Sequence, residues 1–102
     1  MEILEKAVSG TTESSDIYIT VEPHDENTIH VDLQSDVAKQ YGDRIREVIV
    51  NTAKNLGVES VKITAVDSGA LDCTIAARTL NAIQRSLGNE AYNWKEIDTW
   101  NA

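Results

Sequence analysis

Two segments in the first third of the chain alternate between apolar and polar residues. The apolar positions are Ile17, Ile19 and Val21 in the first segment and Ile29, Val31 and Leu33 in the second. A period of two places successive side chains on opposite faces of a β-strand, so each segment is predicted to form a strand with one buried face. Residues 23–27, Pro-His-Asp-Glu-Asn, lie between them and are typical of a turn, which predicts a β-hairpin.

The spacing of the apolar residues then changes to three and four, which is the period of a helix with one apolar face. The positions are Val37, Tyr41, Ile45, Val48, Ile49, Ala53 and Leu56 in the first such stretch, and Leu71, Ile75, Ala76, Leu80, Ile83 and Leu87 in the second. Between the two stretches, Val61, Ile63 and Ala65 alternate with polar residues, which predicts a third strand.

The element order β-β-α-β-α predicts an α+β two-layer sandwich with a three-stranded mixed sheet. Each strand is apolar on one side only, so both helices are expected on the same face of that sheet. The helix between the second and third strands forms a crossover, and a crossover connection sets the two strands that it joins parallel.

The sequence predicts one domain followed by a short tail. A chain of 102 residues has room for a single hydrophobic core, which we assign to residues 1–88. Within this domain, residues 7–15, Ala-Val-Ser-Gly-Thr-Thr-Glu-Ser-Ser, show no clear period and are predicted to form a loop. The tail, residues 89–102, is polar, yet its aromatic content predicts docking onto the domain or onto a partner. The large apolar residues of the tail are Tyr92, Trp94, Ile97 and Trp100.

Composition narrows the classes of function. Nine Lys and Arg against seventeen Asp and Glu give a formal net charge of −8, which disfavours nucleic acid and anionic membranes as partners. The single cysteine cannot form an internal disulfide, and neither a basic leader nor a run of about 20 apolar residues occurs, so a cytoplasmic location is expected. A domain of this size has little room for a deep substrate pocket, so an independent enzyme is not expected.

Side chains with catalytic potential are few, and each has an ordinary structural explanation. Cys73 is a candidate nucleophile near the start of the second helix, but its spacing from Ala76 and Leu80 predicts a buried thiol that faces the sheet. His24 in the turn and His30 on the outward face of a strand lack the spacing of a metal site and are predicted to be solvated. The sequence therefore predicts no catalytic residue and no metal ligand.

The hydroxyl groups of the predicted loop, residues 7–15, are the remaining candidates. A serine or threonine in an exposed loop is either an ordinary turn residue or a site of covalent modification. Chemistry alone does not select one of the five hydroxyl residues in this loop. They are Ser9, Thr11, Thr12, Ser14 and Ser15.

Two short runs of residues resemble a known family. Residues 10–17, Gly-Thr-Thr-Glu-Ser-Ser-Asp-Ile, and residues 69–73, Gly-Ala-Leu-Asp-Cys, resemble the acyl carrier subunit of citrate lyase, the gamma chain. The similarity covers roughly residues 7–87 and includes residues 40–43, Gln-Tyr-Gly-Asp. The resemblance implies that Ser14 carries a 2'-(5''-phosphoribosyl)-3'-dephospho-CoA group through a phosphodiester. Glu13 and Asp16 beside that phosphate are expected to make the loop strongly anionic.

The same resemblance implies a carrier role without catalysis. The terminal thiol of the group would hold an acetyl or citryl unit as a thioester. A separate prosthetic-group transferase would load Ser14, the alpha subunit would exchange acetyl for citryl, and the beta subunit would cleave the citryl thioester into oxaloacetate and acetyl thioester. Two other functions stay open: the carrier subunit of malonate decarboxylase, which uses the same type of group, and a protein-interaction module that is never modified.

Overall fold

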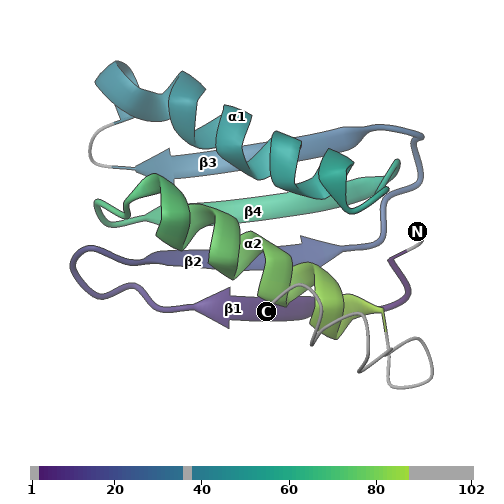
Figure 1. Cartoon of the computed structure of the whole chain (residues 1–102). Helices are drawn as coiled ribbons and strands as arrows, with labels where there is room; N and C mark the ends of the chain where they lie inside the picture. Colours follow the sequence, from purple (N-terminus) through teal and green to yellow (C-terminus); the bar gives the residue numbers. More distant parts are fainter. Residues whose placement is uncertain (1–2, 36–37, 88–102) are drawn as a thin grey trace.

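Four strands and two helices follow one another in the part of the chain that the computed structural model describes, residues 3–35 and 38–87. They are β1 (Ala7–Gly10), β2 (Ile17–Glu22), β3 (Ile29–Ser35), α1 (Ala38–Asn55), β4 (Val61–Asp67) and α2 (Asp72–Ser86). The strands form one mixed sheet, and both helices pack on the same face of it (Figure 1). The predicted two-layer α+β architecture with both helices on one face is therefore confirmed.

The strand order of the sheet is β1-β2-β4-β3. β4 pairs antiparallel with β2, with Ile17 opposite Asp67, and it pairs parallel with β3, with Ile29 opposite Val61. The parallel pair confirms the crossover through α1. The predicted hairpin between β2 and β3 is wrong, because a period of two identifies the buried face of a strand but does not identify its neighbours. β4 lies between these two strands and pairs with both of them.

A strand, β1, occupies the first part of the segment that was predicted to be a loop. It pairs antiparallel with β2, with Ala7 opposite Val21. The sheet therefore has four strands, and the prediction of three strands is wrong. The period of β1 is hidden in the sequence because a polar residue, Ser9, takes an inward position, where it is only 3% exposed. β1 and β2 form a hairpin, and residues 11–16 connect them.

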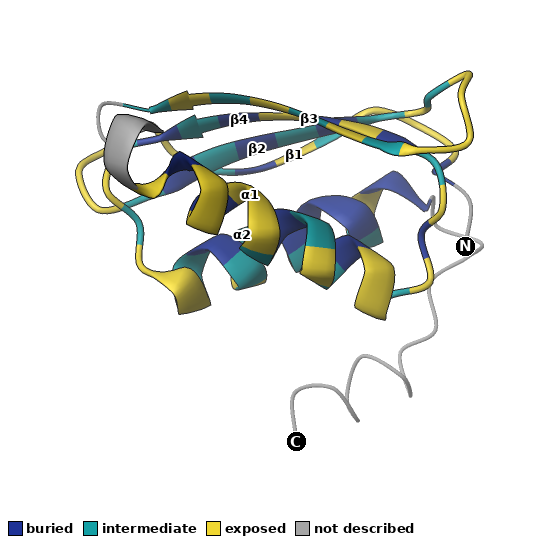
Figure 2. Ribbon diagram, turned by 90° about the horizontal axis from the view of Figure 1, so that it is seen from above, coloured by how far each residue is buried: buried dark blue, intermediate teal, exposed yellow. Residues whose placement is uncertain are grey.

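The core lies between the inner face of the sheet and the two helices (Figure 2). β-Branched side chains pack well on a pleated surface, and burying one of them stabilises the fold by about 1.5–3 kcal/mol. The fully buried aliphatic side chains are Ile17, Ile19, Val21, Ile49, Val61, Ile63, Ile75 and Ile83. The predicted inward positions of β2 and β4 are thus confirmed, whereas those of the edge strand β3 are half-buried.

The apolar stripes of both helices are confirmed in their middle turns and are wrong at their starts. Tyr41 is 56% exposed and Leu71 is 70% exposed. Leu71 precedes α2 in an extended conformation, with φ −75° and ψ 159°, so it does not belong to the helical face. Cys73 is also exposed, contrary to the prediction. It lies two residues before the buried Ile75, and two residues correspond to about 200° around a helix.

Some predictions fall on residues outside the described ranges. These are the inward position of Val37, the domain boundary at residue 88 and the aromatic tail, residues 89–102. Within residues 3–35 and 38–87, neither helix combines the length and the apolar character that a membrane span requires.

Candidate functional site

The β1–β2 loop, residues 11–16, contains the serine to which the resemblance points. The loop projects from one end of the sheet, beside the turn that joins β4 to α2 (Figure 1). Ser14 is exposed, and its hydroxyl forms no hydrogen bond with any residue in the described part of the chain. Its Oγ is therefore accessible to an enzyme that approaches from solvent.

Burial and hydrogen bonding distinguish the five hydroxyl residues of segment 7–15. Ser9 is buried within β1, which removes it as an attachment site for a large group. The Thr11 hydroxyl is engaged, because its Oγ1 donates to Asp16 Oδ2 at 2.8 Å. The backbone of Ser15 has φ 66°, in the left-handed region that residues other than glycine rarely adopt. The candidate attachment sites that remain are the exposed residues whose hydroxyl groups form no hydrogen bond with the described residues. They are Thr12, Ser14 and Ser15.

Asp16 ends the loop and is held by a convergent set of donors. Arg78 of α2 donates from Nε to Oδ1 and from Nη2 to Oδ2, both at 3.0 Å. The Thr11 hydroxyl and the backbone N–H of Ile17 donate to the same carboxylate, the latter at 2.7 Å. The Arg78 guanidinium lowers the pKa of Asp16 to about 2, with further contributions from Thr11 and Ile17. The carboxylate is therefore ionised and neutralised by Arg78 at neutral pH.

No pattern in the sequence points to Arg78 as part of this site. Arg78 and Asp16 are 62 positions apart, and no spacing rule relates residues at that separation. One feature of the sequence could have pointed to it: Arg78 is the only charged residue between Asp72 and Arg85, in a predicted helix of mostly small and apolar residues. The pairing also corrects the expectation of a strongly anionic loop. Among the described residues, Glu13 is the one loop carboxylate without an ion pair.

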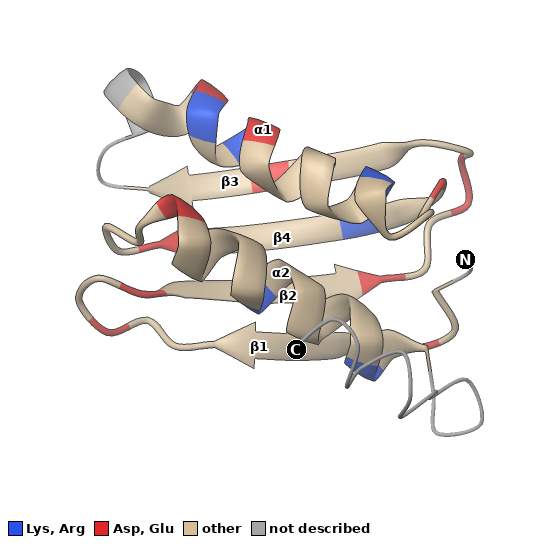
Figure 3. Cartoon of the chain, in the orientation of Figure 1, with Lys and Arg blue, Asp and Glu red and all other residues tan. Residues whose placement is uncertain are grey.

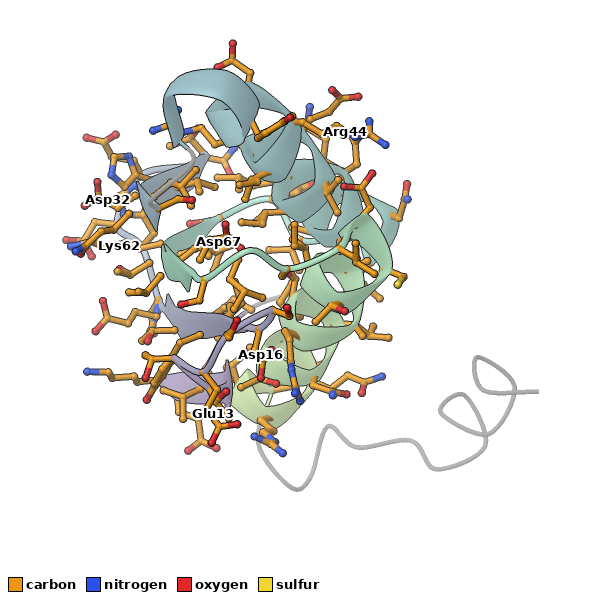
Figure 4. The ribbon with its side chains drawn as sticks, turned by 90° about the vertical axis from the view of Figure 1, so that its left-hand side faces the viewer. Glu13, Asp16, Asp32, Arg44, Lys62 and Asp67 are labelled. Atoms are coloured by element: carbon orange, nitrogen blue, oxygen red, sulfur yellow. The ribbon has the colours of Figure 1, made fainter. Side chains whose placement is uncertain are left out.

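The turn after β4 is hydrogen-bonded to the loop. The backbone N–H of Ser15 donates to the carbonyl oxygen of Ser68 at 2.7 Å, and the N–H of Ser68 donates to the carbonyl oxygen of Asp16 at 2.9 Å. The Ser68 hydroxyl donates to the carbonyl oxygen of Thr12 at 3.2 Å. The two runs that carry the family resemblance are therefore neighbours in space. Figure 4 shows Asp16, which directly precedes β2, and Asp67, which ends β4, on the same side of the molecule.

Asp67 fixes the turn after β4 from the inside. Its side chain is buried, with only 3% of the residue exposed. Oδ1 accepts the backbone N–H of Ala70 at 3.0 Å, and Oδ2 accepts the hydroxyl of Ser35 at 2.9 Å. One buried carboxyl group thus joins the ends of β3 and β4 to the segment that leads into α2.

Gly10 sets the direction in which the chain leaves β1. Its φ is +92°, and a Cβ atom at this position would collide with the carbonyl oxygen of Ile17. Only a residue without a side chain fits both the conformation and the available space. The hairpin geometry that presents the β1–β2 loop therefore depends on this glycine.

Acidic residues lie at both ends of the molecule. At the end that carries the loop, Figure 3 shows them in the β1–β2 loop, at the end of β4 and near the starts of both helices. Two of the charges at the helix starts are paired, because Arg44 Nε and Nη2 donate to Asp72 Oδ2 at 3.0 and 2.8 Å. This pair joins the first part of α1 to the first turn of α2.

The other candidate groups form no metal site in the described part of the chain, where no three His, Cys, Asp or Glu side chains are grouped to hold a metal ion. His30 is exposed, as predicted, and His24 is half-buried, with the two ring centroids 5.9 Å apart. Both histidines line an open hollow of about 650 Å³ together with Lys6, Glu22 and Lys62. Glu22 ends β2, so the hollow and the β1–β2 loop lie at opposite ends of that strand.

Comparison with known sequences shows the family. The model of an acyl carrier protein family described as the malonate decarboxylase delta subunit matches residues 4–86. The citrate lyase acyl carrier protein of Streptococcus equi subsp. zooepidemicus is 58% identical over 102 residues, which is 100% of both chains. The corresponding protein of Streptococcus mutans is 55% identical, again over the whole of both chains. Both curated relatives are therefore similar to this chain along its full length.

Comparison with solved structures agrees on the fold. A chain in the crystal structure of a Pseudomonas malonate decarboxylase hetero-tetramer matches with a TM-score of 0.68, covering 83% of this chain and 87% of that one. The identity is 16%, so this likeness concerns the fold alone. The citrate lyase acyl carrier proteins, by contrast, align with this chain over its whole length and are more than half identical to it. The chain therefore belongs to the family of citrate lyase acyl carrier proteins, which are non-catalytic carrier subunits.

Proposed function

We propose that this carrier holds its acyl unit on a phosphoribosyl-dephospho-coenzyme A group attached through a phosphodiester to Ser14 Oγ. The observation that carries the proposal is the exposed Ser14 hydroxyl, which has no partner among the described residues. When attached, the group supplies a thiol on which the acyl unit is held as a thioester. The chain itself needs no nucleophile for this role, which agrees with the solvated surroundings of the loop.

The residues around Ser14 fit such a group. The attachment residue must be exposed, because the group is large. The loop around it must be anchored to the domain, because the tether then delivers the thiol to neighbouring sites from a fixed position. Arg78 and Ser68 supply that anchor by binding the backbone and side chain on either side of the serine. Glu13 forms no ion pair with the described residues and lies next to the proposed phosphodiester, which favours a basic surface on the protein that receives the loop.

We further propose that the carrier works in the cytoplasm within a citrate lyase complex. Its partners there are the alpha and beta subunits, and a prosthetic-group transferase acts on it beforehand. A tethered group reaches neighbouring active sites at an effective concentration of about millimolar, so the carrier need not enclose any reactant itself. The net charge of −8 supports association with basic surfaces of other proteins and disfavours nucleic acid and anionic membranes.

The direct test is the mass of the protein purified with its transferase. Wild-type protein is expected to gain the mass of the group on the peptide that contains Ser14, and Ser14→Ala is expected to remain unmodified. Ser15→Gly is the matched control, because it removes the neighbouring hydroxyl while suiting the positive φ at that position. Ser15→Gly should be modified fully. An active complex that contains unmodified carrier, or one with full turnover after Ser14→Ala, would contradict the proposal.

A malonate decarboxylase carrier is the second candidate, because the family model that matches the chain is described as the malonate decarboxylase delta subunit. The two functions differ in the partner subunits that accept the modified carrier. Modified protein mixed with the citrate lyase alpha and beta subunits should restore citrate cleavage. Restoration of malonate decarboxylation in the corresponding mixture, without citrate cleavage, would select the second candidate.

A further inference from the structure

Two large apolar side chains are exposed at the end of the molecule that carries Ser14. Leu71 is 70% exposed and Tyr41 is 56% exposed. Both fall in the apolar pattern of a helix, yet neither is covered by the domain. A single exposed apolar residue is common on protein surfaces, so the position of these two side chains is what requires explanation.

Leu71 is held in place beside the β1–β2 loop. The turn that contains it begins at Ser68, whose backbone and hydroxyl make three hydrogen bonds to the loop. The backbone N–H of Ala70, the residue before Leu71, is bound by the buried carboxyl group of Asp67 at 3.0 Å. The backbone carbonyl of Leu71 accepts the N–H of Ile75 at 3.0 Å in the first turn of α2. An exposed apolar side chain on so constrained a backbone loses little conformational freedom when it is bound.

Tyr41 is joined to the same surface through α1. Arg44 lies one helical turn after Tyr41 and binds Asp72, the residue that follows Leu71, at 2.8 Å. Arg44 also contacts Glu47 at 3.3 Å, so one arginine bridges two carboxylates beside the two apolar side chains. The two helix starts therefore present apolar side chains beside an ion-pair network, and Glu13 of the loop lies at the same end of the molecule (Figure 4).

We propose that Leu71 and Tyr41 form the surface on which the enzyme that loads Ser14 docks. This inference rests on the proposed attachment at Ser14. An enzyme that joins a group to Ser14 Oγ must bring its reacting atoms within bonding distance of the loop, so it must cover this end of the domain. Subunits that act on the thiol at the far end of a long arm are under no such constraint. The docking face of the loading enzyme is an apolar hollow with basic side chains facing Glu13.

The decisive variant is Leu71→Ser. Leu71 occupies the N-cap of α2 and makes no side-chain capping hydrogen bond, whereas serine is among the preferred N-cap residues. The variant removes the apolar side chain and favours the start of the helix, so it should unfold at the same temperature as wild type or at a higher one. Leu4→Ser is the matched control. Leu4 is 60% exposed and its N–H binds Ser86 at the other end of α2, about 22 Å away for a 15-residue helix.

The measurement is the rate of loading of full-length carrier by the prosthetic-group transferase with its activated donor, followed by intact mass. Leu71→Ser should raise KM for the carrier about tenfold with kcat within about twofold, because uniform binding energy is lost and the chemistry is untouched. Tyr41→Ala should raise KM in the same direction, and Leu4→Ser should match wild type.

Three outcomes would overturn the inference. An unchanged KM for Leu71→Ser shows that the enzyme does not use this surface. A change in tryptophan fluorescence of the free protein on Leu71→Ser assigns the surface to the chain's own Trp94 and Trp100 segment instead. Peptide mapping that places the group on a residue other than Ser14 refutes the attachment site itself, and the docking argument fails with it. The first two outcomes leave the proposed function intact, so the two failures are distinguishable.

Discussion

Arg78 meets Asp16 through two parallel hydrogen bonds, from Nε to Oδ1 and from Nη2 to Oδ2, each 3.0 Å long. The planar guanidinium matches the carboxylate at both oxygens, which is the strong geometry for this kind of ion pair. The Asp16 side chain is only 13% exposed and that of Arg78 is 36% exposed. The pair fixes the base of the β1–β2 loop to the middle of α2, and so connects the loop to the core.

Breaking this pair should destabilise the fold. Asp16→Asn and Arg78→Gln each remove one partner, and a double-mutant cycle is expected to give a coupling of about 1–2 kcal/mol in the free energy of unfolding. Urea denaturation of the four proteins measures it. The Arg44–Asp72 pair is the matched comparison, because its side chains are more than half exposed and its coupling should be much smaller. Equal coupling in the two cycles would contradict the structural role of Asp16.

The stability of the protein should depend on pH through Asp16. Arg78 lowers the pKa of Asp16 from 3.8 to about 2 in the folded state. Because the folded pKa lies below the unfolded one, the stabilisation is fully present above pH 4 and is lost as the pH falls towards 2. Asp16→Asn lacks this contribution. The difference in unfolding free energy between wild type and Asp16→Asn should therefore shrink between pH 4 and pH 2, and a constant difference would contradict the assignment.

Alanine at position 10 should disrupt the hairpin that carries the loop. Gly10→Ala must relieve a collision with the Ile17 carbonyl oxygen as well as an unfavourable φ, so we expect a loss of more than about 3 kcal/mol in the free energy of unfolding. Gly57→Ala separates the two effects. Gly57 also has a positive φ, +80°, but a Cβ there meets nothing within 4 Å, so its loss should be about 1–2 kcal/mol. Similar losses from the two variants would show that the collision is relieved without strain.

The buried carboxyl group of Asp67 should be required for the turn before α2. Asp67→Ala removes the acceptor of the Ala70 N–H and should lower the free energy of unfolding by about 2–3 kcal/mol. Asp67→Asn retains an acceptor oxygen at Oδ1 and should lose about 1 kcal/mol or less. Hydrogen exchange at the Ala70 amide reports on the turn directly. Faster exchange is expected in Asp67→Ala, and unchanged exchange would contradict this role.

Much of the fold could be predicted from local patterns, because periods of two and of about 3.6 identify buried faces. The inward sides of β2 and β4 and the middle turns of both helices follow from them directly. The partners of each strand do not, since β4 pairs with β2 although residues 23–60 lie between them in the sequence. β1 escaped detection because Ser9 occupies an inward position that an apolar residue usually fills.

The candidate site could be predicted in part. The resemblance pointed to Ser14, and burial then removed Ser9 from the alternatives that chemistry had left open. The residues that anchor the loop could not be predicted from local sequence, because Arg78 and Ser68 contact the loop only in the folded structure. The exposed starts of the helices were missed for a related reason. Spacing assigns Tyr41 and Leu71 to an apolar face without showing where the covering sheet ends.

β4 is the last strand within residues 3–35 and 38–87, yet it occupies an interior place in the sheet. Until residues 61–67 have left the ribosome, β2 lacks one of its two neighbours and the β1–β2 loop lacks the anchors at Ser68 and Arg78. A growing or truncated chain therefore exposes Ser14 before the β1–β2 loop has its anchored conformation. We expect a loading enzyme that recognises this shape to distinguish finished carriers from unfinished ones, so that prosthetic groups are spent only on folded protein.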